Sequence, residues 1–475
     1  MWHKRTRATA RHWMSGLAVT AALVATSAQS TTLADALVGA YNHSGLIDQN
    51  RALLRAADED VAIAAASLKP IINWSADVTR QLGSSASAQT GGRSSRLAQT
   101  TVSAAITASL QLFDGGADKS RIEATKETVL ATRAALLNVE QLLLFRAATA
   151  YFNVIRQQEF VSLTRNNLRL LQEEFRAAQD RFDVGEVTRT DVSLAEAAVA
   201  QARSNLADAE RNLIQAQAEY TNVVGRQPGR LVSLPRLPRV ETSVPRAQAV
   251  AVRTHPDLIQ AQRQVAASEL LALAAGQDLN PTVSLEGRLS LSEEFGSDDS
   301  STVGTVGVNV TGPIYRGGQL SATERRAFAS RDAARGNLHT VRHDVQQDVV
   351  DAIANLQAAR ASLVASERQI RAARVAFQGV REEATLGART TLDVLDAEQD
   401  LLDAETNRIS AQADQYIAAY SVLESMGLLT AERLRLPVQL YDPTSYYNLV
   451  KDGPAKLSKQ GKQLDRIIRT LTPND

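Results

Sequence analysis

The sequence predicts a mixed α and β fold in which one plan of long helices and paired strands is built twice. Three landmarks recur in the same order: Gly115-Gly116 as Gly317-Gly318, Gly185 as Gly387, and Pro70 as Pro281. The first two pairs lie 202 residues apart and the third 211, so the first copy holds a nine-residue insertion. A repeat of about 200 residues is too long for a solenoid and indicates a doubled subunit.

Composition narrows the possible function classes. Aromatic residues make up only 4% of the 475 residues, and Ala, Gln, Arg, Glu and Leu dominate long stretches, which is typical of long helices. The net charge of zero gives no support for nucleic-acid binding. The absence of cysteine excludes disulfides and thiol catalysis, and the six histidines are scattered, so we expect no metal site and no cofactor. No catalytic motif stands out, so we expect that the chain is not an enzyme.

The first 28 residues have the pattern of a signal peptide. Lys4, Arg5, Arg7 and Arg11 form a basic region, and a short apolar stretch covers residues 16–24. Small residues around Ala28 suit a cleavage site, and the apolar stretch is shorter than the roughly 20 residues that span a membrane. A retained anchor is the alternative interpretation. The first repeat is therefore predicted over residues 29–225.

Four segments alternate between apolar and polar residues and are predicted to be strands. The clearest runs from Val102 to Leu112, and others start near Ile72, Val283 and Val306. They form two predicted hairpins, 70–113 and 281–315, with polar connections over 83–96 and 292–301. Strands of about 12 residues suit a transmembrane β-barrel, in which a tilted strand needs roughly 9–11 residues to cross. The alternative, a soluble sandwich, has strands of roughly 5–6 residues.

The remaining chain is predicted to be helical, with two very long helices. Residues 117–184 contain neither proline nor glycine, and residues 320–386 are interrupted only by two glycines. At 1.5 Å per residue each helix is on the order of 100 Å long. Four shorter helices are predicted at 32–68, 188–224, 246–279 and 391–426, so that two placed end to end match one long helix.

Apolar heptads indicate that these helices pack side by side in a ring. Apolar residues lie seven apart from Val192 to Tyr220 and again from Leu395 to Leu423. The latter segment carries a second, alanine ladder on nearly the opposite side, which suits a helix with a neighbour on each flank. Four strands cannot close a barrel, and open edges in lipid leave backbone groups unpaired, so further copies of the chain are the simplest source of the missing strands. A trimer would give twelve strands.

The other boundaries follow from these elements. A proline-rich connector is predicted over residues 226–245 and the second repeat over 246–427. Residues 428–475 form a C-terminal segment whose end is expected to be disordered.

Several motifs resemble one family. They are Phe113-Asp114-Gly115-Gly116, Tyr315-Arg316-Gly317-Gly318, Ala150-Tyr151-Phe152-Asn153-Val154 and the segment from Gly387 to Asp396. Through them, residues 32–450 resemble the TolC family of outer-membrane channel-tunnels. The resemblance implies a homotrimer in the outer membrane, with a 12-stranded transmembrane β-barrel continuous with a long α-helical coiled-coil barrel in the periplasm.

The resemblance also implies a function and partners. We expect a passive exit duct of a tripartite export machine, embedded in outer-membrane lipid. It is expected to work with a periplasmic adaptor (membrane fusion protein) and an inner-membrane ABC or proton-driven transporter. Type I protein secretion is the favoured task, and multidrug efflux of small molecules is the alternative. A periplasmic coiled-coil adaptor or structural spacer is the alternative from a different class.

Each repeat has a predicted helix-hairpin turn with the pattern Gly-x-x-Thr-x-x-Asp. The turns span residues 185–190 and 387–392. Glycine permits the left-handed residue that ends a helix, and Thr188 and Thr390 are predicted to cap the next helix. Asp191 and Asp393, three residues later, are the acidic members of a capping box. The turns, with Gly185 and Gly387, are also the predicted docking site for an adaptor.

The second turn carries additional charge. Asp393, Asp396, Asp400 and Asp403 follow a three-four spacing that places them on one helix face. That face is either solvated or lines the lumen and selects cations.

The resemblance further implies a gate at the periplasmic tip. Its residues are Arg389, Asp393 and Asp396, with Thr190 and Asp191 as partners in the first repeat. An Arg389–Asp191 bridge would hold the tip closed. Ala384 occupies a position at which the family often has tyrosine, so part of this closing network is expected to differ.

Overall fold

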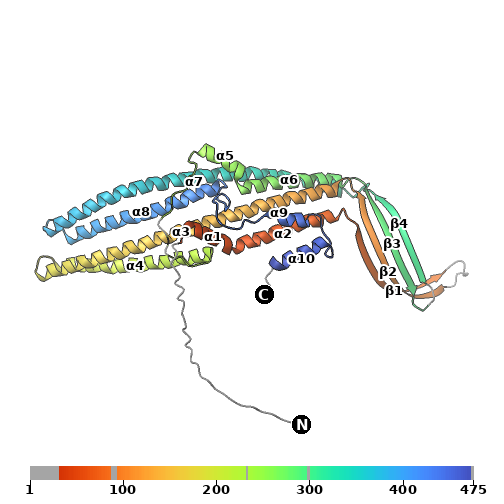
Figure 1. Cartoon of the computed structure of the whole chain (residues 1–475), viewed down its shortest axis with the longest axis horizontal. Coiled ribbons are helices and arrows are strands. Elements are labelled where there is room, and N and C mark those ends of the chain that lie inside the picture. The colour runs from red at the N-terminus through yellow and green to blue at the C-terminus, as the bar shows by residue number, and fades with distance from the viewer. Residues whose placement is uncertain (1–30, 87–93, 230, 232–233, 297–299, 472–475) are drawn as a thin grey trace, which may run out of the picture.

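The computed structural model describes residues 31–86, 94–229, 231, 234–296 and 300–471. Within them the chain is elongated, with a β-sheet at one end and two helix-hairpin tips at the other (Figure 1). The predicted signal peptide lies outside the described residues, as do the last four residues of the C-terminal segment.

Two continuous helices form the long axis of the molecule. These are α3 (Ala117–Asp183) and α7 (Gln319–Thr385), each of 67 residues. Their continuity follows from the lack of proline in both ranges. Gly336 and Gly379 are tolerated inside α7, although each costs about 1 kcal/mol relative to alanine.

Of the four shorter helices that the sequence predicted, two are unbroken and two are each divided into two helices. Two of them, α4 (Arg189–Val224) and α8 (Thr391–Ser425), are unbroken. The predicted helix 32–68 is divided into α1 (Leu33–His43) and α2 (Gly45–Ala66). The division occurs at Ser44, whose side chain accepts a hydrogen bond from the Ile47 amide and so begins a new helix.

The predicted helix 246–279 is likewise divided, into α5 (Val244–Thr254) and α6 (Pro256–Gln277). His255 precedes a proline and has an extended backbone with ψ of 125°. Proline crowds the residue before it out of the helical region and donates no amide hydrogen bond, which explains the break.

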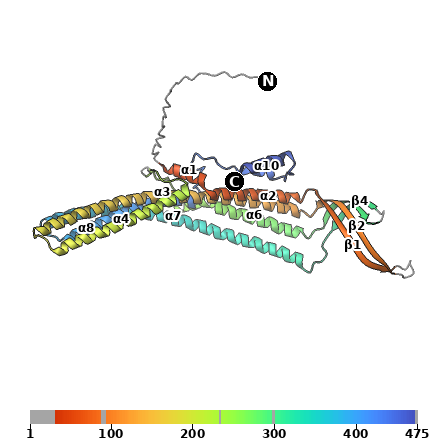
Figure 2. The same cartoon turned by 90° about the horizontal axis from the view of Figure 1, so that it is seen from below.

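The two repeats have the same helical layout. In the first, α4 and α2 lie end to end along α3, and in the second, α8 and α6 lie along α7 (Figures 1 and 2). In addition, α3 packs against α6 and α8 of the second repeat. Helix α3 therefore holds the two repeats together along most of the length.

The four strands form one antiparallel sheet in the order β1-β2-β3-β4. Their bounds are Ile71–Ala86, Ser94–Phe113, Thr282–Glu294 and Ser300–Thr311. The strands of the first hairpin, with 16 and 20 residues, are longer than the predicted length of about 12 residues, and both connections are shorter than predicted. The second hairpin ends earlier than the predicted 315, because Pro313 follows closely and donates no ladder hydrogen bond.

The sheet has one apolar and one polar face. Trp74, Ile106 and Leu289 lie opposite one another on the apolar face. Asn73, Thr107 and Arg288 form the adjacent row on the polar face. The apolar face is exposed, with Trp74 81% accessible. Because β1 and β4 are at the ends of the strand order, each presents an edge that has no strand partner within the described chain.

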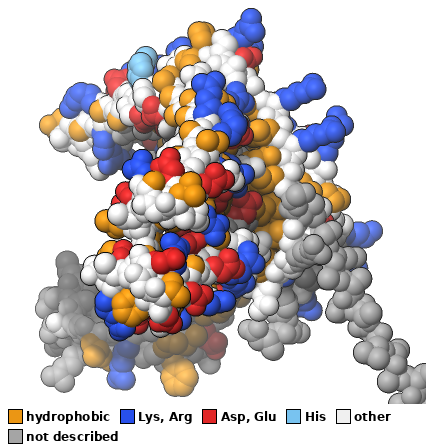
Figure 3. All heavy atoms as spheres, turned by 90° about the vertical axis from the view of Figure 1, so that its left-hand side faces the viewer, with side chains coloured by type: hydrophobic (Ala, Val, Ile, Leu, Met, Phe, Trp, Pro, Cys, Tyr) orange, Lys and Arg blue, Asp and Glu red, His pale blue; other side chains and the backbone are white. Residues whose placement is uncertain are grey.

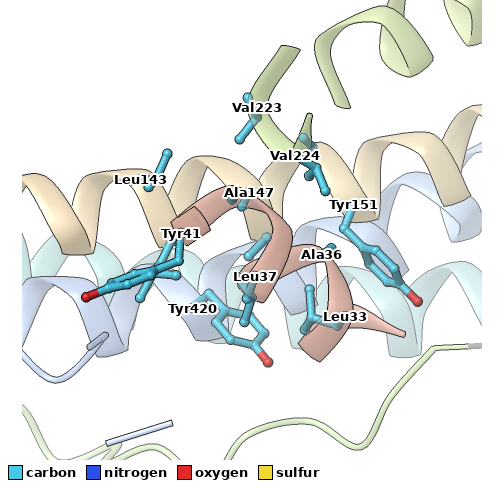
Figure 4. Close-up of a cluster of buried hydrophobic side chains, with 14 of the residues drawn as sticks. Leu33, Ala36, Leu37, Tyr41, Leu143, Ala147, Tyr151, Val223, Val224 and Tyr420 are labelled. Atoms are coloured by element: carbon cyan, nitrogen blue, oxygen red, sulfur yellow. The ribbon is translucent and has the colours of Figure 1, made fainter. Parts of the chain in front are cut away.

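The main core lies at mid-length, where both repeats meet. Phe152 of α3 is fully buried and stacks on Tyr416 of α8 with ring centroids 4.9 Å apart. Tyr420 and Tyr151 complete an aromatic cluster around it at 5.9 and 5.5 Å. Helix α1 covers this region with Leu33, Ala36, Leu37 and Tyr41 (Figure 4).

The connector and the C-terminal segment cover the outside of the helices. In the connector, Leu234 and Leu237 pack on the main core, and the Tyr416 hydroxyl donates to the Pro235 carbonyl at 2.7 Å. The C-terminal segment contains two helices that the sequence analysis did not predict, α9 (Pro443–Val450) and α10 (Lys459–Leu471). Helix α9 packs on α2, and Tyr446 donates a hydrogen bond to Glu59 at 2.7 Å.

Candidate functional site at the hairpin tips

Both tips are built from the same backbone turn. Gly185 and Gly387 have φ of 82° and 76°, a left-handed conformation that favours glycine. Beyond each, an amide reaches back across the turn: Glu186 donates to Arg181, and Ala388 donates to Glu383, both at 2.9 Å. These hydrogen bonds satisfy carbonyls at the ends of α3 and α7. Helices α3 and α7 therefore end with these carbonyls hydrogen-bonded, and the turns that follow are exposed at the tips.

The next helix at each tip begins with a capping box, as predicted. The Asp191 amide donates to the Thr188 hydroxyl at 3.4 Å, and the Thr188 amide donates to the Asp191 carboxylate at 2.9 Å. Thr390 and Asp393 repeat the arrangement at 3.2 and 2.9 Å. Hydrogen bonds from threonine lower the pKa of both aspartates below the ordinary range.

The latch expected between Arg389 and Asp191 is not formed within this chain. Arg389 Nε instead donates to Glu383 Oε2 at 2.9 Å, and this pairing raises the pKa of the guanidinium. Glu383 lies in the last turn of α7, six residues before Arg389, so the arginine side chain reaches it within the same tip. Thr391 of α8 lies close enough to Asp191 of α4 to help lower the pKa of that carboxyl group, so the two tips of one chain lie next to each other. Thr190 is exposed.

The predicted acidic stripe lies on the surface of α8. Asp396, Asp400 and Asp403 are exposed, and Asp403 accepts a hydrogen bond from Gln399 at 2.8 Å. Viewed from the tip end, basic side chains are interspersed with the acidic ones (Figure 3). Ala384 is in the last turn of α7 and is only partly buried.

A buried carboxyl group near the tips was missed by the sequence analysis. Glu398 of α8 is 4% exposed, and its Oε1 accepts a hydrogen bond from Asn167 of α3 at 3.0 Å. Burial raises the pKa of this group to about 7, and the nearby Glu174 carboxylate adds to the increase. Its burial could have been predicted from its position in the heptad pattern. Glu398 follows Leu395 by three residues and precedes Leu402 by four, so it lies on an apolar helix face.

An ion pair joins the two hairpins beside Glu398. Arg381 of α7 lies 2.9 Å from the Glu174 carboxylate of α3. The Glu174 side chain is only 11% exposed, whereas Arg381 is 47% exposed. Leu171, Val199 and Leu395 form an apolar cluster where the two hairpins meet, and we call this contact region the joint. Together these contacts hold the α7–α8 hairpin against the α3–α4 hairpin close to the tips.

Comparison with known proteins agrees with this architecture. The outer membrane efflux protein family matches residues 36–226 and 250–428, which include all four strands and most of the helical residues of both repeats. The chain belongs to the outer membrane efflux protein family. It is 35% identical over 432 residues to the outer membrane efflux protein BepC of Brucella suis, covering 90% of this chain and 92% of BepC.

Two further proteins are similar to this chain, one in sequence and one in fold. The outer membrane protein TolC of Escherichia coli is 26% identical over 405 residues, covering 78% of this chain and 81% of TolC. The CmeC outer membrane channel of Campylobacter jejuni has the same fold, with a TM-score of 0.74 at 16% identity and 89% coverage of both chains. This efflux-family chain is therefore a TolC-type channel of the outer membrane, which confirms the predicted family and decides against a periplasmic adaptor or spacer.

Proposed function

We propose that three copies of this chain form the outer-membrane exit duct of a tripartite export machine. The observation that carries this proposal is the sheet. One of its faces is apolar and exposed, the opposite face is polar, and both edge strands lack partners in the single chain.

Closure by further copies satisfies these edges. In the hydrocarbon core of a membrane no water is available for unpaired backbone groups, so only closed barrels are stable there. The edge of β4 can pair with β1 of the next copy, and three copies bring twelve strands into one barrel. The apolar face then contacts lipid, and the polar face, with Asn73, Thr107 and Arg288, lines the lumen.

The helices continue the duct away from the membrane. Two hairpins per chain, α3–α4 and α7–α8, give a ring of twelve helices in the trimer. The tips then mark the periplasmic entrance. The exposed turns at Gly185 and Gly387, with Thr188 and Thr390, are the proposed docking site for a periplasmic adaptor. An inner-membrane ABC or proton-driven transporter supplies the energy in this arrangement, and the duct itself is passive.

We place the gate at the second turn. Arg389 is exposed beside Glu383 and can exchange this partner for Asp191 of an adjacent copy when three tips converge. Asp393 and Asp396, with the stripe at Asp400 and Asp403, then bring acidic rings to the entrance and favour cations. The expected Arg389–Asp191 latch is thus proposed to form between copies of the chain.

Two cargo classes are supported by the names of relatives. Protein secretion, the favoured task from the sequence, is supported by the alkaline protease secretion protein AprF of Pseudomonas aeruginosa, 26% identical over 302 residues. Small-molecule efflux is supported by BepC, named an efflux protein. A deletion strain separates them: loss of a secreted protein from the medium indicates the first, and sensitivity to toxic compounds indicates the second.

The duct itself is tested on purified protein. A heat-dissociable trimer in the outer-membrane fraction that conducts ions in a planar bilayer is the expected result. A monomer in the soluble periplasmic fraction would refute the proposal.

A further inference from the structure

Glu398 is buried without being fully satisfied. Its Oε1 accepts one hydrogen bond, from Asn167, but Oε2 is inaccessible to solvent and has no hydrogen-bond partner among the described residues. A carboxyl group in this position costs stability, and such exceptions in native structures often have a functional reason. A leucine would fill the same seam at lower cost.

Four helices meet at the joint around Glu398, namely α3, α4, α7 and α8. Figure 1 shows these helices running side by side to the tips. Helix α8 carries Glu398, α3 contributes Asn167 and Glu174, and α7 contributes Arg381. From α4 the joint receives apolar side chains, Val199 and Ala202. Within the described residues, the charges that act on Glu398 are therefore the Glu174 carboxylate and the Arg381 guanidinium.

The protonation state of Glu398 sets the charge balance of the joint. When it is neutral, one guanidinium faces one carboxylate, and the joint carries no net charge. When it is ionised, two carboxylates that are largely shielded from solvent share one guanidinium. Burial and Glu174 raise the pKa of Glu398 to about 7, while Arg381 and the hydrogen bond from Asn167 oppose the increase.

We propose that Glu398 is a gate-positioning residue, which holds the α7–α8 hairpin against α3 when protonated and releases it when ionised. The inference rests on the proposed duct and specifies how its entrance is controlled. The step is a simple proton transfer to water that accompanies separation of the hairpins. No other bond forms or breaks.

The sign of the pH dependence follows from linkage. In separated hairpins Glu398 reaches water and ionises with its ordinary pKa of 4.5. The packed joint is therefore fully favoured below pH 4.5. Its advantage decreases about tenfold per pH unit as the pH rises toward 7, and stays constant above that value. The entrance is expected to open as the pH rises through this interval.

A distance measurement tests the joint directly. Because the sequence has no cysteine, nitroxide labels can be attached at Glu173→Cys of α3 and Glu382→Cys of α7, both exposed beside the joint. With labelled chains diluted into unlabelled ones, electron paramagnetic resonance should show a longer distance that gains population between pH 4.5 and 7. In Glu398→Gln the short distance should persist at every pH, and Glu398→Leu should behave in the same way.

Two further variants separate this carboxyl group from its neighbours. Asp180→Asn removes an exposed carboxylate of α3 that is not among the charges acting on Glu398, and it should leave the transition unchanged. Glu174→Gln removes the like charge and should move the upper end of the transition to lower pH. A distance that does not respond to pH in the unmodified chain, or a transition that survives in Glu398→Gln, would overturn the inference.

Conductance distinguishes this inference from the proposed duct. In planar bilayers the unlabelled protein should conduct better as the pH rises over the same interval, and Glu398→Gln should reduce that response. If the distance responds to pH but no variant conducts, the joint is supported and the duct is refuted.

Discussion

Phe152 offers the sharpest test of how the two repeats are held together. Its ring is fully buried between α3 of the first repeat and α8 of the second, with Tyr416 at 4.9 Å, Tyr151 at 5.5 Å and Tyr420 at 5.9 Å. Truncation of a buried phenylalanine to alanine costs about 3–5 kcal/mol, which includes the cavity that remains. We expect Phe152→Ala to fall in the upper half of this range, because aromatic pairs add about 0.5–1.5 kcal/mol beyond burial.

The matched control is Phe152→Leu. Leucine keeps most of the apolar volume and loses the ring contacts, so its expected cost is about 1–2 kcal/mol. Guanidinium titrations followed by helical circular dichroism, at one protein concentration, give the difference as a shift in midpoint at unchanged slope. A cost below about 1.5 kcal/mol for Phe152→Ala, or equal costs for both variants, would show that this cluster does not hold the repeats together.

Three more predictions concern the membrane, the caps and the tips. Val78→Arg, midway along β1 on the exposed apolar face, should cost about 2–4 kcal/mol and deplete the outer-membrane fraction, whereas Thr79→Arg on the polar face should not. Equal depletion would contradict the assignment of faces. Thr188→Val should cost about 1 kcal/mol, measured as faster hydrogen exchange in the first turn of α4. Arg381→Glu should raise conductance by separating the hairpins, and adding Glu174→Arg should restore it; no restoration would rule out this pair as the cause.

The sequence predicted the strands and the long helices, but it did not predict where two of the shorter helices are interrupted. Strand alternation and the absence of proline predicted the sheet and both long helices. The break at Ser44 depends on one side-chain cap inside a pattern that otherwise continues, so periodicity could not reveal it. The break at His255 did have a signal, since Pro256 follows it, and proline restricts the preceding residue.

At the candidate site, too, local contacts were predicted from the sequence and contacts between distant segments were not. The capping boxes were predicted because they need only residues three apart. The partner of Arg389 depends on distances across the tip, which the sequence does not give. In the structure Arg389 pairs with the nearby Glu383 and not with Asp191. Glu398 was missed because its burial comes from α3 and α7, which are remote in sequence.

The internal repeat leads to a final prediction about the joint between copies. Glu196 lies 202 residues before Glu398 and is its counterpart on α4, yet it is exposed. The difference arises because α8 is flanked by α3 and α7 within the chain, whereas α4 lies against α3 and packs on no second long helix among the described elements. In a closed ring that side faces the next copy. Repeat symmetry then places Gln369, the counterpart of Asn167, against Glu196.

Cysteine labelling can test whether the ring closes in this way. A maleimide reagent should modify Glu196→Cys in the dissociated chain but not in the assembled trimer. Glu398→Cys should be protected in both, because its burial is internal to the chain, and Arg189→Cys at the exposed tip should react in both. Equal reactivity of Glu196→Cys in the two states would mean that α4 stays open to solvent. The ring of twelve helices would then be wrong, even if the sheet closes into a barrel.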